Sequence, residues 1–372
     1  MYIQTNYRPT KAVIDLQAIA SNIRSLRGHL QPDVQIIAVV KANAYGHGDI
    51  EVAKAAIQAG ATMLAVATPD EAVHMRTNFP DIDILILGAT PPNFIPYASK
   101  ENITLTVFSA DWINSAKVYS PLVQSVKVHI KIDSGMGRIG VTTKEELQAL
   151  YEAITATSQF TLDGIFTHFA TADEEDTLYF DNQVYLFKEL LGVLPTKPRL
   201  VHVANTATAL VKDTSLQYDA VRFGISMYGL TPSSYVGEIL PFPIQPAFSL
   251  QTELVHVKKL EAGQSVGYGA LYTADEDVYI GTIPIGYADG MIRKLSGQEV
   301  LVDGERAKII GRICMDQSMI LLPKAYNVGE PVVLIGQQGQ QEITMDDWAN
   351  KLETINYEVP CVITARVPRV YK

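Results

Sequence analysis

Length, composition and charge narrow the class of protein. The chain has 372 residues, 47% hydrophobic and 19% charged, a balance typical of a chain that folds throughout. The net charge of −10 disfavours a nucleic-acid or anionic-membrane surface and leaves small anions as charged partners. The two cysteines have neither metal-ligand nor disulfide-framework spacing, and neither a secretory start nor an apolar run of membrane-spanning length is found. We therefore expect a cytoplasmic protein with no metal site and no nucleic-acid or membrane partner.

Short apolar runs alternate with helical patterns over the first 230 residues. Residues 17–30 carry apolar side chains at helical spacing, and residues 36–40 form an apolar run that ends in Lys41 and a glycine-rich turn. Alternation continues, and the predicted strands span residues 36–40, 63–67, 82–87, 103–107, 126–133, 162–168, 200–205 and 220–222. Eight strands covered by helices fit a (β/α)8 TIM-type barrel better than an open sheet. We assign residues 1–240 to this barrel.

Local signals mark helix starts and a second domain. Thr68 with Glu71 has the spacing of a capping box, Ser109 precedes another helix, and Thr344 opens a helix over residues 344–352. Prolines after residue 231 mark a linker, and the runs beyond it are rich in β-forming residues. These patterns predict a C-terminal, mostly β-strand domain over residues 241–372, with residues 344–352 as its one helix.

Lys41 stands where a buried parallel strand ends. A charged residue there is costly unless it faces a cavity, and burial lowers the pKa of an amine so that it becomes nucleophilic. Such an amine can react with an aldehyde. The alternative is that Lys41 extends from the strand end into solvent.

Polar residues recur at the other strand ends. Barrel active sites lie at the carboxyl ends of the strands, where the sequence places Lys131 and Asp133, His168, Asn205 and Arg222. Alternation along residues 126–133 also puts Lys127, His129, Lys131 and Asp133 on one face of that strand. Each residue alone has a structural explanation, but their shared position predicts a site at one mouth of the barrel.

One motif points elsewhere. Residues 135–140 (GMGRIG) match the glycine pattern of dinucleotide-binding loops, with Asp163 as a candidate ribose-binding acid. The match follows the fifth predicted strand instead of opening a βαβ unit, so a dinucleotide oxidoreductase is a weak alternative. The sequence holds no H-E-x-x-H, G-x-S-x-G or Walker pattern for metal hydrolysis, serine hydrolysis or phosphoryl transfer.

Several segments together resemble one enzyme family. Residues 38–48 (AVVKANAYGHG) closely resemble the cofactor-lysine segment of alanine racemases, enzymes that use pyridoxal 5'-phosphate (PLP). The resemblance continues, in family order, through KIDSGMGR at 131–138, THFA at 167–170, VRFGI at 221–225, GYGA at 267–270 and CMD at 314–316. The lysine segment is shared with related barrel enzymes, whereas the combination is more specific.

The resemblance implies a cofactor site. It implies a PLP-binding barrel and a homodimer in which the β domain contributes to the partner subunit's active site. Lys41 would bind the cofactor covalently, His168 would lie beside its ring, and Arg222 would face the ring nitrogen. A fixed cation there disfavours ring protonation and restrains transamination. The residues expected around the phosphate are Tyr45, Asn205, Thr206, Gly224, Ile225 and Tyr357.

Racemisation requires two opposed acid–base groups at the Cα of the substrate. The resemblance assigns them to Lys41 and to Tyr268 of the partner subunit, in an isomerase that interconverts L- and D-alanine and supplies D-alanine for cell-wall (peptidoglycan) synthesis. Met315, Asp316, Tyr287 and Arg138 are the candidate substrate-binding residues.

Other interpretations stay open at this point. In some alanine racemases the residue matching Lys131 is a carbamylated lysine that pairs with the arginine found here as Arg138. The alternative functions are a broader amino-acid racemase, a PLP decarboxylase of the same fold and a non-catalytic PLP-binding protein.

Overall fold

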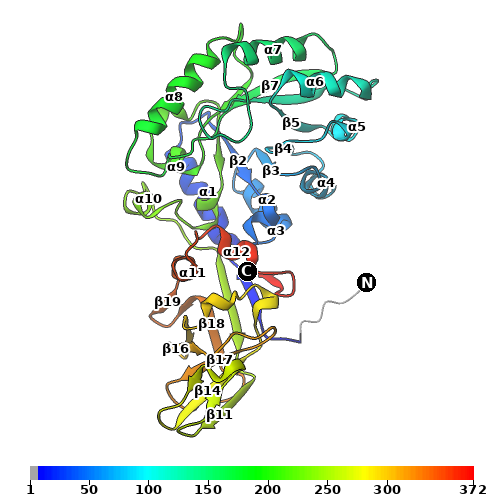
Figure 1. Cartoon of the computed structure of the whole chain (residues 1–372). Helices are drawn as coiled ribbons and strands as arrows, with labels where there is room; N and C mark the ends of the chain where they lie inside the picture. Colours follow the sequence, from blue (N-terminus) through cyan, green and yellow to red (C-terminus); the bar gives the residue numbers. More distant parts are fainter. Residues whose placement is uncertain (1–6) are drawn as a thin grey trace. The chain divides into compact units, whose positions relative to one another are not determined.

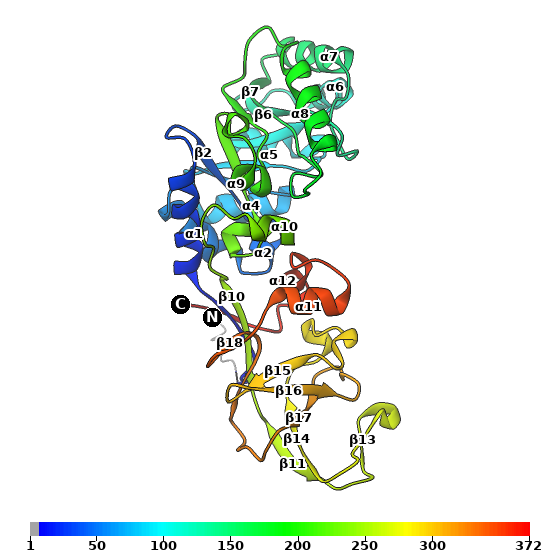
Figure 2. The same ribbon diagram turned by 90° about the vertical axis from the view of Figure 1, so that its left-hand side faces the viewer.

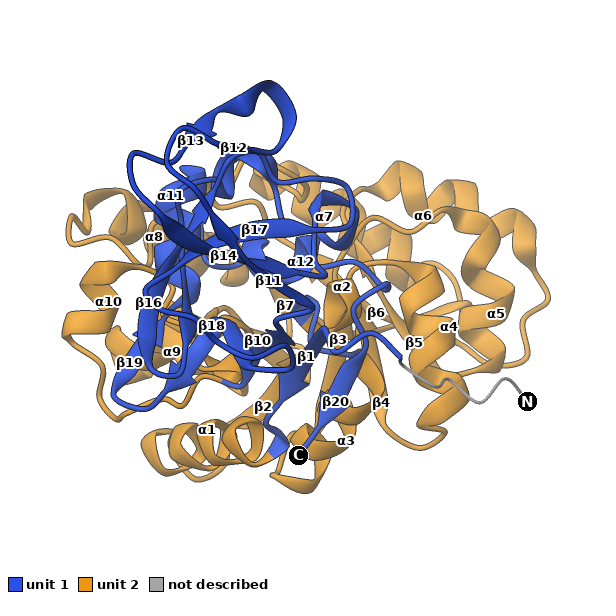
Figure 3. Cartoon of the chain, turned by 90° about the horizontal axis from the view of Figure 1, so that it is seen from below, with its two compact units in different colours: residues 1–16, 45–48, 247–372 blue, residues 17–44, 49–246 orange. Residues whose placement is uncertain are grey.

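The chain forms two compact units. The computed structural model describes residues 7–372 (Figure 1). Residues 17–44 and 49–246 form one unit, here called the barrel unit; residues up to 16, 45–48 and 247–372 form the other, the β unit (Figure 3). Within the described residues, no helix has both the length and the apolar character needed to cross a membrane.

Eight parallel strands build the core of the barrel unit. Along the sheet they follow the order β8-β7-β6-β5-β4-β3-β2-β9. Two backbone hydrogen bonds, from Asp219 N to Val201 O (3.1 Å) and from Arg222 N to Ala204 O (3.0 Å), join its two edges, so the barrel is nearly closed. The strands are β2 (Gln35–Val39), β3 (Met63–Val66), β4 (Asp83–Ile86), β5 (Ile103–Val107), β6 (Val126–Lys131), β7 (Phe160–Phe166), β8 (Leu200–His202) and β9 (Ala220–Phe223).

Helices follow the strands, as the alternating pattern predicted (Figure 2). Thr68 forms the predicted capping box with Glu71, and the Ser109 side chain accepts from Trp112 N. The helices are α1 (Leu16–His29), α2 (Lys41–Tyr45), α3 (Asp49–Gln58), α4 (Pro69–Asn78), α5 (Ile95–Lys100), α6 (Ala110–Ala116), α7 (Lys144–Thr155), α8 (Leu178–Leu191), α9 (Thr206–Val211) and α10 (Ser234–Glu238), with 3-10 turns η1 (Pro92–Phe94), η2 (Lys117–Tyr119), η3 (Thr214–Leu216) and η4 (Ile225–Tyr228).

A ten-stranded sheet dominates the β unit. Its order is β11-β14-β17-β16-β15-β18-β10-β1-β20, with β19 paired to β18, and β12 with β13 forms a separate hairpin. The strands are β1 (Lys11–Ile14), β10 (Phe248–Glu253), β11 (His256–Leu260), β12 (Ser265–Val266), β13 (Tyr272–Thr273), β14 (Val278–Ile283), β15 (Glu299–Val302), β16 (Glu305–Ile310), β17 (Ser318–Leu322), β18 (Pro331–Gln338), β19 (Gln341–Ile343) and β20 (Arg369–Tyr371). Shorter elements are η5 (Tyr268–Ala270), η6 (Tyr287–Asp289), η7 (Arg293–Leu295), α11 (Met345–Leu352) and α12 (Glu358–Val362).

The structure corrects two details of the sequence interpretation. The N-terminal strand β1 pairs with β10 and β20, so it belongs to the β unit, whereas the sequence placed all residues before 241 in the barrel. Four residues are too few to show a clear two-residue period. The helix predicted at 344–352 is α11, capped by Thr344, but α12 is a second helix of the same unit.

Candidate active site

Lys41 begins an unusual turn after strand β2. Ala42, Asn43, Ala44 and Tyr45 all have φ between 51° and 54°, in the left-handed region. Such a conformation costs roughly 1–2 kcal/mol for each residue that is not glycine. Strained backbone of this kind persists where surrounding contacts hold it, and it concentrates at functional sites.

Neighbouring side chains hold this turn within the barrel unit. The Glu71 carboxylate accepts from Ala42 N (2.7 Å) through one oxygen and from Ala67 N (2.7 Å) through the other. Asn43 accepts from Asp49 N at 3.0 Å. Glu71 therefore caps α4 and also fixes the backbone directly after Lys41. The capping motif revealed Glu71, but nothing in its spacing indicated this second contact.

The loop after β6 is organised by Asp133. Its carboxylate accepts from the amides of Gly135 (3.0 Å), Gly137 (3.0 Å) and Arg138 (2.7 Å). Burial alone would raise the pKa of Asp133, but these amides outweigh it and hold the pKa below its usual value. A dinucleotide phosphate would need the same amides. The glycine motif is therefore the binding loop of a carboxylate of this chain, and the oxidoreductase alternative loses its support.

Lys131 is buried at the end of β6, on the polar strand face predicted from the sequence. Its Nζ donates to Ile132 O at 3.0 Å and lies 5.2 Å from the centre of the Phe166 ring. Burial, together with the positive charge of Arg222, lowers the pKa of Lys131 to about 7, although Asp133 opposes the shift. A large fraction of this amine is therefore neutral near neutral pH.

Arg222, on β9, is the most tightly held of the candidate residues. One terminal nitrogen donates to His202 Nδ1 (2.9 Å) and to the His202 carbonyl, and the other donates to Thr167 O (2.8 Å) and Val203 O (3.1 Å). Burial and the nearby Arg138 lower the pKa of Arg222 to about 9, which keeps it charged at neutral pH. Among residues 7–372, no acceptor bonds its Nε–H.

His168 lies beside this guanidinium. Its Nδ1 is 3.4 Å from an Arg222 terminal nitrogen. Burial and the cationic groups around it, Arg222 first, hold the pKa of His168 well below its usual value, so the imidazole is neutral.

Two helix starts meet after β8 and β9. Asn205 caps α9 by accepting from Thr208 N at 3.0 Å, and it donates to Phe169 O at 3.2 Å. The Thr206 hydroxyl accepts from Gly224 N at 3.0 Å, which ties the start of α9 to the residue that precedes η4. The structure thus brings Asn205, Thr206, Gly224 and Ile225 together.

Three candidate residues of the β unit have strongly exposed side chains. Tyr268 is 71% exposed, Met315 53% and Tyr287 43%. The segments of Tyr287 and Met315 are bonded to each other, because Tyr287 N donates to Cys314 O (3.0 Å) and Ala288 N to Met315 O (3.0 Å). Asp316 pairs with Arg366 at 2.8 Å. Tyr45 and Tyr357 also belong to this unit, with their ring centres 6.2 Å apart.

Comparison with known proteins gives the family. Residues 14–232 match the family profile "Alanine racemase, N-terminal domain", and residues 247–371 match "Alanine racemase, C-terminal domain". An alanine racemase of Anoxybacillus flavithermus is 52% identical over 98% of this chain and 95% of its own length. The chain belongs to the alanine racemase family. It is therefore an isomerase that interconverts L- and D-alanine.

Solved structures of alanine racemases share its fold. The crystal structure of the Bacillus anthracis alanine racemase with bound L-Ala-P superposes with a TM-score of 0.96 at 43% identity, covering 99% of this chain and 96% of that one. A histidine racemase from Leuconostoc mesenteroides superposes with a TM-score of 0.91 at 34% identity, with 99% of both chains covered. The alanine racemase fold therefore also carries racemisation of a larger amino acid.

The sequence missed the partners that hold the alanine racemase site residues. His202 was hidden inside a three-residue strand, and Asp163 was read only as a candidate ribose contact. In the structure Asp163 is bonded to Arg199 at 2.7 and 2.6 Å. A polar residue inside an otherwise apolar strand was the available signal.

Proposed function

We propose that this alanine racemase uses PLP, held at the mouth of the barrel unit with Lys41 as its covalent attachment point. The observation that carries the proposal is the state of Arg222, whose Nε–H is left for an acceptor from outside the described chain while its terminal nitrogens are saturated. A pyridine nitrogen without a proton is such an acceptor. The residues present therefore fit the cofactor.

The neighbouring groups suit the rest of the cofactor. The hydrogen bond from Gly224 N to the Thr206 hydroxyl joins the starts of α9 and η4, and this juxtaposition of two helix starts supports a phosphate near Thr206, Gly224 and Ile225. We extend this phosphate site to Asn205, Tyr45 and Tyr357 on the family resemblance. His168, neutral and next to Arg222, suits the side of an aromatic ring without adding charge to it.

The cofactor and the residues of this protein would have different parts in the reaction. PLP, when bound, withdraws electrons from the substrate Cα and so acidifies its Cα–H bond. The Lys41 amine moves the proton on one face of Cα. Arg222 keeps a positive charge at the ring nitrogen, which disfavours a second proton there and so restrains transamination.

The opposite face needs a second group, for which we propose Tyr268 of the partner subunit in a homodimer. Support comes from the exposure of Tyr268, Met315 and Tyr287, the last two on segments that are hydrogen-bonded to each other, because exposed large apolar side chains can mark an interaction surface. Met315 and Asp316 of the same surface would receive the substrate carboxylate through a backbone amide, and Tyr287 would narrow the entrance. Arg138, exposed after β6, is the remaining candidate for orienting the substrate.

Lys131 is a candidate for carbamylation. A neutral buried amine can attack carbon dioxide through Nζ, forming an N–C bond and releasing one proton. The product carries a negative charge, which the cations Arg222 and Arg138 favour electrostatically. Density for a carboxylate on Nζ in a crystal structure, or a ¹³C carbamate resonance after ¹³C-bicarbonate labelling, tests this modification.

Borohydride reduction followed by peptide mapping tests the cofactor proposal. We expect the pyridoxyl label on Lys41, and a label on any other lysine would refute the scheme. Time courses with L-alanine, L-serine and L-histidine then separate alanine specificity from the broader racemase, which the histidine racemase neighbour makes worth testing. Carbon dioxide release without D-alanine would instead indicate a decarboxylase, and bound PLP without either product a carrier protein.

A further inference from the structure

A hydrogen-bonded chain of side chains runs through the interior of the barrel unit. Arg222 contacts His202 Nδ1 at 2.9 Å, His202 Nε2 contacts His129 Nδ1 at 2.9 Å, and His129 Nε2 contacts Asp163 Oδ2 at 3.2 Å. Arg199 then holds both carboxylate oxygens of Asp163. Both histidines are completely buried. Apart from the contact of His202 with Arg222, none of the roles assigned above uses these histidines, Asp163 or Arg199.

The chemistry of its two ends gives this chain a direction. A guanidinium only donates, so His202 Nδ1 must accept and His202 carries its hydrogen on Nε2. That hydrogen is donated to His129 Nδ1, so His129 carries its hydrogen on Nε2 and donates it to Asp163. Both histidines are then neutral, in agreement with burial, which lowers the pKa of each. All three hydrogen bonds point from Arg222 towards Asp163.

The surrounding fold is shaped for this arrangement. Gly164 lies opposite His129, and a methyl group at Gly164 would meet the His129 ring at 2.7 Å. Phe166 stacks on His202 with ring centres 4.7 Å apart and planes at 12°. Burial would raise the pKa of Asp163, but Arg199 and His129 outweigh it and hold the carboxyl ionised. The hydrogen-bonded chain of side chains therefore ends in a fixed negative charge at Asp163.

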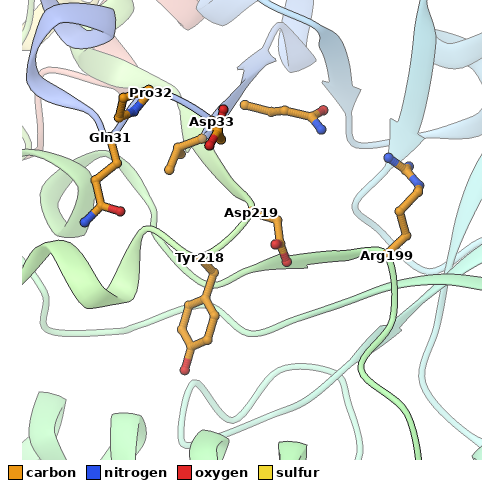
Figure 4. Close-up of a pocket in the computed structure, with 8 residues that line it drawn as sticks. Gln31, Pro32, Asp33, Arg199, Tyr218 and Asp219 are labelled. Carbon is orange, nitrogen blue, oxygen red and sulfur yellow. The ribbon is translucent and has the colours of Figure 1, made fainter.

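Its outer end reaches a pocket at the opposite end of the barrel from the site. The pocket, of about 250 Å³, is lined by Gln31, Pro32, Asp33, Val34, Gln35, Arg199, Tyr218 and Asp219 (Figure 4). Gln35 is the first residue of β2, while Arg199 and Asp219 directly precede β8 and β9, so the pocket lies at the amino ends of the strands. Half of the Arg199 side chain is exposed there.

We propose that Asp163 is a positioning residue that acts on Arg222 through His129 and His202. Without its carboxylate, His129 is free to carry its hydrogen on Nδ1, which would oppose the N–H of His202. His202 would then move its hydrogen to Nδ1 and face Arg222 donor to donor. The Asp163 charge thus keeps an acceptor in front of Arg222 and aligns the dipoles of the chain. This inference rests on the proposed role of Arg222 beside the cofactor ring.

Neutron crystallography of the full-length enzyme locates the hydrogen atoms of the hydrogen-bonded side chains, and this test does not depend on activity. We expect hydrogen on Nε2 and none on Nδ1 in both His129 and His202. Hydrogen on His202 Nδ1 would overturn the proposal. The borohydride label reports separately on the cofactor. An unlabelled Lys41 together with the expected histidine tautomers would refute the cofactor proposal but would still support the hydrogen-bonded chain of side chains.

Asp163→Asn and Asp219→Asn form a matched pair for kinetics. Asp219 belongs to the same pocket, pairs with Lys197 at 2.9 Å and accepts from Val201 N at 2.8 Å, but no hydrogen bond joins its side chain to Asp163, His129, His202 or Arg222. We expect D163N to lower kcat about tenfold with KM within about twofold and to increase transamination per racemisation, as for other residues that orient a functional group. D219N should change none of these. Equal behaviour of the two variants would overturn the proposal.

Arg199→Met is a second variant that we expect to fold, because the Arg199 side chain is half exposed. It frees the Asp163 carboxylate to turn away from His129, and we expect the same rise in transamination at a smaller loss of kcat. A positioning role for Asp163 would be refuted if the ratio of transamination to racemisation is unchanged in R199M, and D163N either shows the same unchanged ratio or does not fold.

Discussion

Most candidate residues of the barrel unit and most of those of the β unit are held in opposite ways. Arg222, Lys131 and Thr206 are buried and hydrogen-bonded, whereas Tyr268, Met315 and Asp316 lie exposed on loops. A preorganised charge array needs little rearrangement to act, which suits a cofactor that stays bound. Exposed loops suit groups whose surroundings are completed by association. The difference is the one that the proposed dimer requires, in which one part of the site is formed by folding and the other by association of subunits.

Subunit complementation tests whether Lys41 and Tyr268 act from different subunits, and it has the largest expected effect. Lys41→Ala and Tyr268→Phe should each lower racemisation by about a thousandfold, since each removes one acid–base group. In co-expressed mixtures, half of the dimers pair one chain of each kind and contain one intact site. Activity should then recover to about a quarter of the wild-type level. Mixtures as inactive as the parents would place both groups in the same chain.

A pair of glycines compares the two units in stability. At Gly140, φ is +132° and a methyl group would meet Asp133 N at 2.5 Å and Lys131 O at 2.9 Å. At Gly269, φ is +75° and the nearest atom, from the Arg312 side chain, is 3.7 Å away. Gly140→Ala should cost about 3 kcal/mol or more of unfolding free energy, and Gly269→Ala about 1 kcal/mol.

Urea unfolding followed by fluorescence measures both effects. The two tryptophans, Trp112 in α6 and Trp348 in α11, report on different units, so W112F and W348F backgrounds separate the transitions. Similar losses for the two glycine variants would contradict the contrast between a tightly packed barrel loop and an open β-unit loop.

The sequence predicted the architecture better than the support of the site. The alternation of short apolar runs with helical patterns placed the eight barrel strands, and the two-residue period of residues 126–133 put Lys127, His129, Lys131 and Asp133 on one strand face. Contacts between distant segments could not be predicted in this way. Glu71 bonding Ala42, or Asp163 bonding His129, depends on which strands become neighbours and at what register. The short strand β1 was missed because its pairing, not its four residues, defines it.

Lys131 should make barrel stability depend on pH. Its pKa is about 7 in the folded chain and near its ordinary value of 10.5 after unfolding, so the unfolded chain binds more protons between these values. Stability should therefore rise with pH across this window, and the cost of the buried charge is complete only below about pH 7. Lys131→Met removes the group, so its stability advantage over wild type should shrink from pH 7 to pH 10.

Urea unfolding in carbon-dioxide-free buffer at pH 6 to 10 measures this difference, with Lys127→Met, at the partly exposed lysine paired to Asp83, as the control. A constant difference between K131M and wild type across that range would refute a depressed pKa. Added bicarbonate should stabilise wild type and leave K131M unchanged if Lys131 is carbamylated.

Asp316→Asn should have the smallest effect on folding and still alter function. Asp316 and Arg366 are both about half exposed, and an exposed ion pair contributes less than about 1 kcal/mol to stability. Arg366 also keeps its contact with the buried Asp289 at 3.4 Å, so the loop retains an anchor. If the β-unit surface receives the substrate carboxylate after association, D316N removes a negative charge beside that carboxylate and should lower KM for alanine by about threefold, with an unchanged unfolding midpoint. A lowered midpoint with unchanged KM would instead make Asp316 a structural residue and weaken the case for this face of the β unit as the substrate side.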